Sequence, residues 1–273
     1  MLIYRLVGRQ SNVSCPVDRR TLGLDMTLVM VSGALANKLD QGGEAWVRLS
    51  YLQGLRRLGL DVHFVEQIAR ETCVDALGKP SDFESSANLD YFNQVVAEFG
   101  LSNCSTLLPV DREGRAPLDT VLLDLADSAA ALLNISGHLS IEPLFQRFRK
   151  KVFVDIDPGY TQYWHAAGIA GARVKGHDYY FTIGENIGSA ACPIPTSGIR
   201  WLPTRPPVVL DAWPAVQTTE PVRFTTIANW RGSFGVVQFE NQSFGQKVHE
   251  FRKLFELPKL VPWDFEIALN IHP

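Results

Sequence analysis

The stretch from Leu28 to Glu66 constrains the fold more than any other part of this sequence. Its order of residue types is that of a strand, a glycine loop, an amphipathic helix and a second strand. Leu28–Ser32 is a short apolar run of strand length, and Asp61–Glu66 has the pattern of the second strand. Two parallel strands joined through a helix form a right-handed unit. The chain is therefore predicted to begin an α/β domain.

The predicted helix follows a loop, 33–43, that ends in the pair Gly42-Gly43. Apolar residues recur every three or four positions on one face, namely Ala45, Leu49, Leu52, Leu55 and Leu58. Gly59 is placed to end the helix. The polar residues that fall mostly off this stripe are Arg48, Gln53, Arg56 and Arg57.

A glycine pair before a helix lets a ligand approach the backbone N–H groups at the positive helix end. Gly42 and Gly43 are therefore predicted to bind substrate, in a domain that handles a nucleotide or a sugar phosphate. The pair fits neither GxGxxG nor the Walker loop. A tight turn into a helix is the alternative interpretation.

Composition excludes several classes of protein. A chain of 273 residues holds one large or two modest domains. A net charge of −3 gives no indication of a nucleic-acid partner. No apolar run reaches 18 residues, so no membrane span is predicted.

Four scattered cysteines without CxxC spacing predict no zinc site, and they favour a reducing cytoplasm as the location of the protein. Residues 1–25 lack the apolar core of a secretory signal. We predict that they form a disordered leader and that Met26 is the natural start, with a short targeting or partner-binding arm as the alternative.

Alternation of strands and helices continues up to about residue 205. Further strands are predicted at Ala131–Ser136, Val152–Ile156 and Asp178–Ile183. Helices are predicted at 89–99, Leu118–Asp127, Ile141–Arg149 and Thr161–Ala167, with a charged loop at Pro109–Pro117. This order predicts an α/β fold with a doubly wound, parallel, Rossmann-like sheet over residues 26–205.

Polar residues follow the predicted strands where each one ends. His138 follows the first of the three further strands, Asp157 the second, and Glu185 with Asn186 the third. In such sheets the ligand lies at the carboxyl ends of the strands. These residues are therefore predicted to form one composite site, although loops are polar in any case.

A proline-rich segment, 206–222, is predicted to link two domains. Beyond it the sequence predicts a strand at Arg223–Ala228, a loop at 229–243, an amphipathic helix at Phe244–Phe255 and a strand at Phe265–Ile271. This content is too small to bury both faces of a parallel sheet. We therefore expect residues 223–273 to be the start of a truncated second Rossmann-like domain, and the missing C-terminal half to be a partner of this one.

Several runs together resemble one family. They are Asn37–Gly43 with Trp46, Ile135–His138, Asp155–Gly159 with Trp164-His165, Gly184–Gly188, Pro203–Val208, Trp230–Gly232 and Lys247–Phe251. These runs resemble the N-terminal domain and first βαβ unit of GT-B glycosyltransferases, and in particular a group of bacterial glycosyltransferase-like proteins.

The resemblance implies transfer of a sugar from a nucleotide-diphosphate sugar to an unknown acceptor, with no cofactor beyond that co-substrate. His138 would hydrogen-bond the sugar or shuttle a proton. Arg231 and Lys247 would stabilise the leaving diphosphate. The chain alone is expected to be inactive, because its donor half is incomplete.

Three alternatives remain open. Asp155-Ile156-Asp157 has the DxD pattern of a metal site, but GT-B enzymes need no such metal, and none is predicted. Asp157 is then the functional residue of the pair and Asp155 the structural one. A sugar-nucleotide epimerase would use Asp157 or Glu185, and a non-catalytic fragment would only bind a sugar or an acceptor.

Overall fold

The computed structural model describes residues 27–270 except 216, 218–222, 231–234 and 246–247. The chain divides into two compact units between Trp213 and Pro214, within the segment predicted as a linker. Each unit is described by itself. The predicted leader, residues 1–25, lies outside the described residues.

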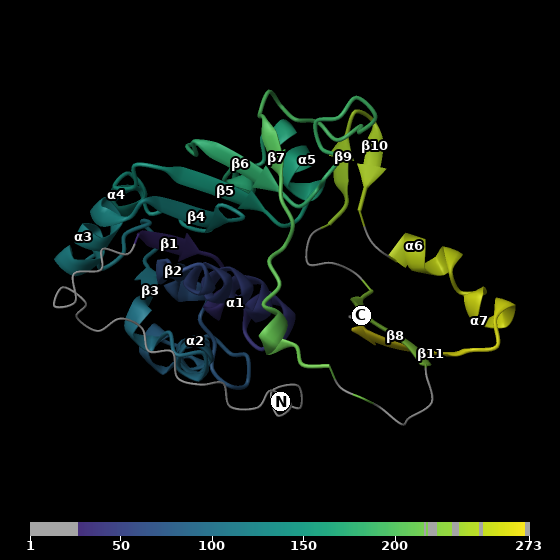
Figure 1. Cartoon of the computed structure of the whole chain (residues 1–273), viewed down its shortest axis with the longest axis horizontal. Helices are drawn as coiled ribbons and strands as arrows, with labels where there is room; N and C mark the ends of the chain where they lie inside the picture. Colours follow the sequence, from purple (N-terminus) through teal and green to yellow (C-terminus); the bar gives the residue numbers. More distant parts are fainter. Residues whose placement is uncertain (1–26, 216, 218–222, 231–234, 246–247, 271–273) are drawn as a thin grey trace. The chain divides into compact units, whose positions relative to one another are not determined.

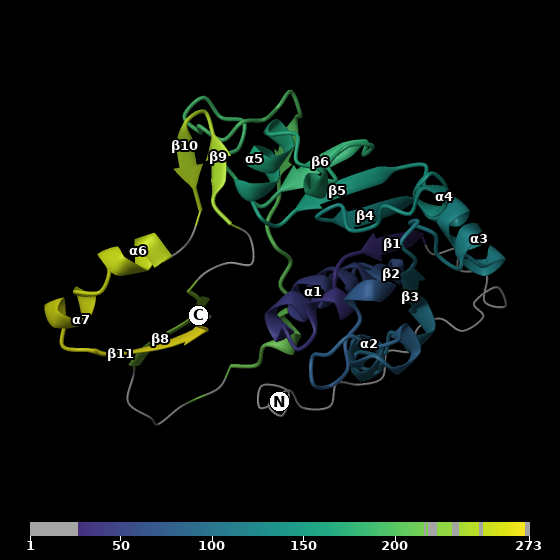
Figure 2. The ribbon, with the colours of Figure 1, turned by 180° about the vertical axis from the view of Figure 1, so that it is seen from behind.

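The first unit contains an all-parallel sheet of seven strands in the order β3-β2-β1-β4-β5-β6-β7 (Figures 1 and 2). Its strands are β1 (Leu28–Ser32), β2 (Asp61–Ala69), β3 (Ser105–Val110), β4 (Ala131–Ile135), β5 (Lys151–Asp155), β6 (Tyr179–Thr182) and β7 (Trp201–Pro203). Its α-helices are α1 (Gly42–Arg57), α2 (Ala87–Glu98), α3 (Thr120–Ser128), α4 (Glu142–Phe145) and α5 (Tyr160–Ala166). The predicted Rossmann-like α/β class is thereby confirmed, whereas a GT-B arrangement is not shown.

Helices cover both faces of the sheet, and the strand pleat explains why. Along β1, Val29 and Val31 belong to a core cluster with residues of α1 and α2, whereas Met30 belongs to a second cluster with residues of α3 and α4. Figure 1 accordingly shows α1 beside α2, and α3 beside α4. A strand buried on both faces has the continuous apolar run that the sequence shows at 28–31.

The strand order reverses at β1, which pairs with β2 on one side and with β4 on the other. Connections that leave the sheet at such a switch point diverge and open a crevice at the carboxyl ends of the strands. The loops that follow β1 and β4 therefore border the place where this kind of fold binds ligands.

Both edge strands were absent from the sequence prediction. β3 overlaps the segment predicted as a loop from Pro109, and β7 lies in a region without a predicted element. Each contains a proline, Pro109 in β3 and Pro203 in β7. A proline cannot donate to the ladder, so it weakens the strand pattern, but it is tolerated at a sheet edge.

Residues 206–213 belong to the first unit and pack on its helix α1. The Trp213 ring lies 4.8 Å from the Trp46 ring of α1, centroid to centroid. The guanidinium of Arg57 donates to the Asp211 carboxylate at 2.6 Å. The first part of the proline-rich segment is thus held along α1.

The second unit contains two small sheets. β8 (Arg223–Asn229) pairs in parallel with β11 (Asp264–Asn270), and β9 (Val237–Phe239) forms a hairpin with β10 (Gln242–Phe244). Glu240 and Asn241 both have positive φ, as the tight hairpin turn requires. This hairpin corrects the loop predicted at 229–243. Within the helix predicted at Phe244–Phe255 the structure has the shorter α6 (Val248–Lys253), while Phe244 belongs to β10, and a further short helix, α7 (Leu257–Leu260), follows outside the predicted range.

Two further findings bear on the sequence predictions. Among the described helices none has the length and apolarity to cross a membrane. Cys73 and Cys192 are free thiols. The cytoplasmic location stays a prediction.

Candidate anion site at the switch point of the sheet

The loop after β1 is held by one buried carboxylate. Glu66, near the end of β2, accepts hydrogen bonds from the backbone N–H groups of Leu35, Ala36 and Asn37 at 2.8 to 3.0 Å, and from the Asn37 side-chain amide at 2.9 Å. Burial raises the pKa of Glu66, and these hydrogen bonds oppose the shift. With its acceptor positions used, Glu66 fixes the path from β1 toward α1.

Arg48 of α1 lies buried at this place, with only 4% of its surface exposed. Its two described hydrogen bonds both use Nη1 and go to the Glu44 carbonyl and the Glu44 carboxylate, one turn nearer the start of the helix. Its Nε is buried and has no partner among the described residues. Arg48 is therefore buried with one donor that has no partner among the described residues.

Gly33, directly after β1, leaves room for this side chain. A Cβ at position 33 would lie 3.0 Å from Arg48 Cγ and 3.1 Å from Arg48 Nε. Such contacts are closer than real side chains normally make. Glycine is therefore favoured at position 33 because the Arg48 side chain packs against it, and not because the backbone makes a tight turn there.

The exit of β4 forms the other wall. Ser136 and Gly137 both have positive φ, so the chain turns sharply after the strand. A Cβ at Gly137 would lie 2.6 Å from the Arg173 carbonyl oxygen, so only glycine fits there. This close approach places the Arg173 guanidinium within 3.1 Å of the His138 carbonyl, to which it donates.

His138 lies between these groups. Its Nε2 donates to the Gln67 carbonyl at 2.9 Å and lies 4.0 Å from a carboxylate oxygen of Glu66. Burial lowers the pKa of His138 to about 3, and the charges of Arg173, Arg48 and Lys38 lower it further, against the opposing effect of the Gln67 carbonyl. The imidazole is therefore neutral near pH 7.

The three cations that act on His138 come from three segments, namely the loop after β1 (Lys38), helix α1 (Arg48) and the loop after α5 (Arg173). The start of α1 adds its partial positive charge, since its N-cap residue, Gln41, makes no side-chain capping bond. Glu44, in the first turn of α1, pairs with Arg48 and offsets part of this positive charge. The cations that remain suit an oxyanion.

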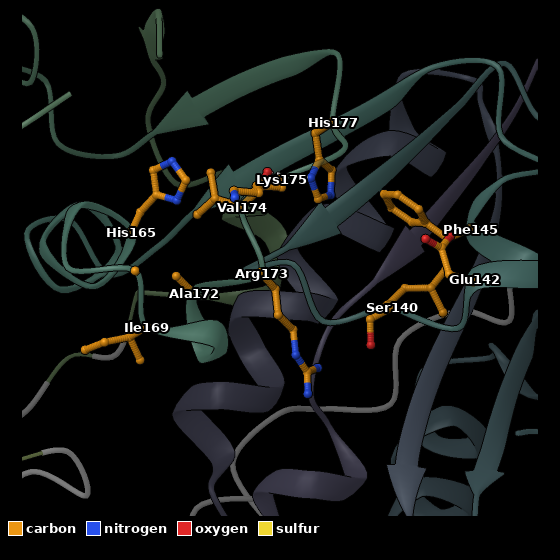
Figure 3. Close-up of a pocket in the computed structure, with 12 residues that line it drawn as sticks. Ser140, Glu142, Phe145, His165, Ile169, Ala172, Arg173, Val174, Lys175 and His177 are labelled. Atoms are coloured by element: carbon orange, nitrogen blue, oxygen red, sulfur yellow. Dashed lines mark hydrogen bonds between the residues drawn. The ribbon is translucent and has the colours of Figure 1, made fainter. Parts of the chain in front are cut away.

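A cavity of about 470 Å³ adjoins Arg173. Figure 3 shows its lining, with Ser140, Glu142 and Phe145 on one side and His165, Ile169 and Ala172 on the other. The Arg173 side chain extends away from its neighbours Val174 and Lys175 in that view. Arg173 thus belongs both to the cavity and to the cation group.

The buried side-chain amide of Asn134 fixes the segments that line this cavity. Asn134 of β4 donates to the Leu139 carbonyl and accepts from the Leu139 N–H, each at 2.9 Å. His177 donates from Nδ1 to the Val174 carbonyl at 3.0 Å, so its Nε2 accepts from the Asn134 amide at 3.0 Å. Burial lowers the pKa of His177. The loops that carry Leu139 and Val174 are thereby fixed.

The structure places the predicted site residues at the exits of three neighbouring strands, β4, β5 and β6. His138 lies at the switch point, whereas Asp157, Glu185 and Asn186 are exposed beyond β5 and β6. Glu185 accepts a hydrogen bond from Arg205 at 2.8 Å. Arg231 and Lys247 lie outside the described residues.

Gly42 and Gly43 lie inside the first turn of α1 and not in the preceding loop. A Cβ at Gly43 would meet nothing within 4 Å. No described protein atom therefore requires glycine at position 43, and the predicted ligand contact of Gly42 and Gly43 stays a prediction.

Sequence reasoning missed Arg48, Glu66 and Arg173. Arg48 was placed off the apolar stripe of its helix, which is wrong. It stands three residues after Ala45 and four before Leu52, both buried, and at 100° per residue this position belongs to the buried face. A charged residue on the buried stripe was the signal available. Nothing local in the sequence marks Arg173.

Within the described parts of the chain, no group of three or more His, Cys, Asp or Glu residues could hold a metal ion. The Asp155 carboxylate instead accepts from the Asp157 N–H at 3.0 Å, Thr161 Oγ1 at 2.8 Å, Gln162 Nε2 at 2.8 Å and Thr182 Oγ1 at 2.7 Å. These four bonds account for its burial.

No protein-family model matches the chain, and no curated protein matches it either. Among solved structures, the chain is similar to an N-carbamoylsarcosine amidase from Thermoplasma acidophilum. The identity is 16%, the match covers 52% of this chain and 92% of that chain, and the TM-score is 0.30. A likeness this slight carries no argument for amidase activity.

These comparisons correct the family prediction. No family model matches the chain, and the solved structure named above is an amidase and not a glycosyltransferase, so the predicted GT-B membership and sugar transfer are wrong and the nucleotide-sugar donor is without support. The resemblance misled because several of its motifs lie at strand exits, which every Rossmann-like sheet has. Such a sheet supports many unrelated functions.

Proposed function

We propose that the first unit binds a small oxyanion, such as a phosphate or a carboxylate, at the switch point between β1 and β4. The observation that supports this most directly is Arg48. Its Nη1 pairs with the Glu44 carboxylate, but its Nε is buried without a partner among the described residues, beside a glycine that leaves room for it.

The buried Arg48 Nε, which has no partner among the described residues, lowers the stability of the folded chain. A buried donor without an acceptor costs about 1–3 kcal/mol. A bound oxyanion accepts from that donor and recovers part of this free energy. It also interacts favourably with Lys38 and Arg173, whose charges already act on the same place.

The neighbouring groups set what the site accepts. Glu66 directs its oxygens at the loop residues 35–37. His138 is neutral and adds no positive charge. The site thus offers arginine donors, which match the planar or tetrahedral geometry of carboxylate and phosphate.

The test is calorimetric titration of the whole chain with phosphate and with acetate at low ionic strength. We expect a dissociation constant of about 1 mM or tighter for one of them. Arg48→Met should weaken that binding by about tenfold or more, because it removes the buried donor.

The matched control is Arg57→Met, since Arg57 lies in the same helix but is exposed and paired with Asp211. Its affinity should equal that of the unaltered chain. Absence of binding, or equal loss in both variants, would show that the proposed site does not exist.

A further inference from the structure

We propose that the anion bound at the switch point carries an apolar body, and that this body occupies the 470 Å³ cavity beside Arg173. This inference rests on the proposed function and specifies its ligand class. The ligand is an organic phosphate or carboxylate with a group of about the size of an aromatic ring.

The cavity has the composition that such a ligand needs. Its floor is apolar and buried, formed by Leu139, Phe145, Ala172 and Val174. Its rim carries the exposed cations Arg173 and Lys175, together with Glu142. Pockets for small molecules in proteins have volumes of roughly 300–1,000 Å³ and combine apolar walls with a few polar groups.

Arg173 connects the cavity to the anion site. Its side chain lines the cavity, while its Nη1 donates to the His138 carbonyl and its charge acts on the His138 ring. One guanidinium therefore borders both places. An anionic group and the apolar body attached to it would contact Arg173 at the same time.

The cavity is also preformed. Asn134 and His177 fix its two sides through buried hydrogen bonds. Ile169, which is 47% exposed, stands on the rim as an apolar side chain available to a ligand. Binding therefore requires little ordering of the protein, so the apolar contact adds to affinity.

The experiment compares two matched pairs of ligands by calorimetric titration of the whole chain, phosphate against phenyl phosphate and acetate against benzoate. We expect the aromatic member of the preferred pair to bind about tenfold tighter or more. The pair that shows this gain identifies the anionic group.

Variants on the rim locate the aromatic ring. Ile169→Trp fills part of the cavity and Ile169→Ser removes apolar lining, and either should reduce the gain to about threefold or less while phosphate or acetate binds as before. Leu77→Ser is the control, because Leu77 is 79% exposed and does not line the cavity. Its gain should be unchanged.

The outcomes separate the two proposals. If no ligand of either pair binds, the proposed anion site is overturned and this inference with it. If phosphate or acetate binds but its aromatic counterpart binds no tighter, only this inference fails. If both Ile169 variants keep the full gain of the unaltered chain, the ring lies elsewhere and the cavity assignment is wrong.

Discussion

Asp155 and Arg48 are both buried charges at the carboxyl edge of the same sheet, but their surroundings differ. Asp155 accepts four hydrogen bonds from Asp157, Thr161, Gln162 and Thr182. Arg48 uses only Nη1, on a single residue, and leaves its Nε without a partner among the described residues. Burial alone therefore does not identify a binding site, and an unsatisfied donor is the more informative sign.

The difference also predicts how each residue contributes to stability. A buried charge with all its hydrogen bonds made holds its partners in place, so its loss leaves them unpaired. A buried charge with a free donor is held at a cost that a ligand relieves. The following predictions test this contrast in order of expected size.

The largest effect is expected from Asp155→Ala. The change leaves buried donors of Thr161, Gln162 and Thr182 without acceptors, so the free energy of unfolding should fall by about 3–5 kcal/mol. Urea unfolding measures it. Asp157→Ala, at the exposed neighbouring residue, should cost less than about 1 kcal/mol. Equal losses in the two variants would contradict the structural role of Asp155.

The next effect concerns pH. His138 has a pKa of about 3 in the folded protein, below the 6.5 of an unperturbed histidine. As the pH falls below 6.5 the unfolded chain takes up a proton that the folded one does not, so stability is lost on acidification. The slope contributed by His138 is about 1.4 kcal/mol per pH unit.

Urea unfolding between pH 4.5 and 7.5 should show this slope, and His138→Gln should reduce it by about that amount. His63 provides a comparison, because burial lowers its pKa to about 4 and its Nε2 is hydrogen-bonded to Thr106 and not to a residue of the anion site. His63→Gln should reduce the slope similarly, since the effect arises from burial of a neutral histidine. An unchanged slope in His138→Gln would show that His138 titrates normally.

A smaller effect is expected from Arg48→Met. The change removes a buried donor that has no partner among the described residues, which is favourable, but it also removes the cation that pairs with the partly exposed Glu44 carboxylate. The two effects oppose each other, so the free energy of unfolding, measured with urea, should change by less than about 1 kcal/mol while anion affinity is lost. A loss of several kcal/mol would place Arg48 with Asp155 as a structural charge.

The smallest effects compare two glycines. Gly43→Ala should stabilise the protein by about 0.5–1 kcal/mol without changing phosphate or acetate affinity, because its Cβ meets nothing. Gly33→Ala puts a methyl group against Arg48 and should weaken affinity. Thermal unfolding and titration of both variants measure this. A loss of affinity in Gly43→Ala with no loss in Gly33→Ala would instead indicate that the ligand contacts Gly43.

The interior of the first sheet could be predicted from the sequence, and its edges could not. β1, β4 and β5 are short apolar runs with helices between them, and each was predicted within one residue. β3 and β7 carry prolines and a weaker apolar pattern. Edge strands pair on one side only, so sequence constrains them less.

The site was predictable only where it coincides with strand ends. His138 follows a strand, and it does lie at the switch point. Asp157 and Glu185 also follow strands, but they lie beyond β5 and β6, farther along the sheet. Strand order, and not the presence of polar loops, decides which strand ends meet.

What the sequence by itself determined is the α/β class, since apolar runs of strand length and amphipathic helices are local properties of the chain. Only the tertiary structure brings Arg48, Glu66 and Arg173 close to His138. These four residues belong to segments far apart in the chain, and they meet because the parallel sheet reverses its order between β1 and β4. Whether a buried charge is satisfied depends on such long-range partners, and no local pattern records them.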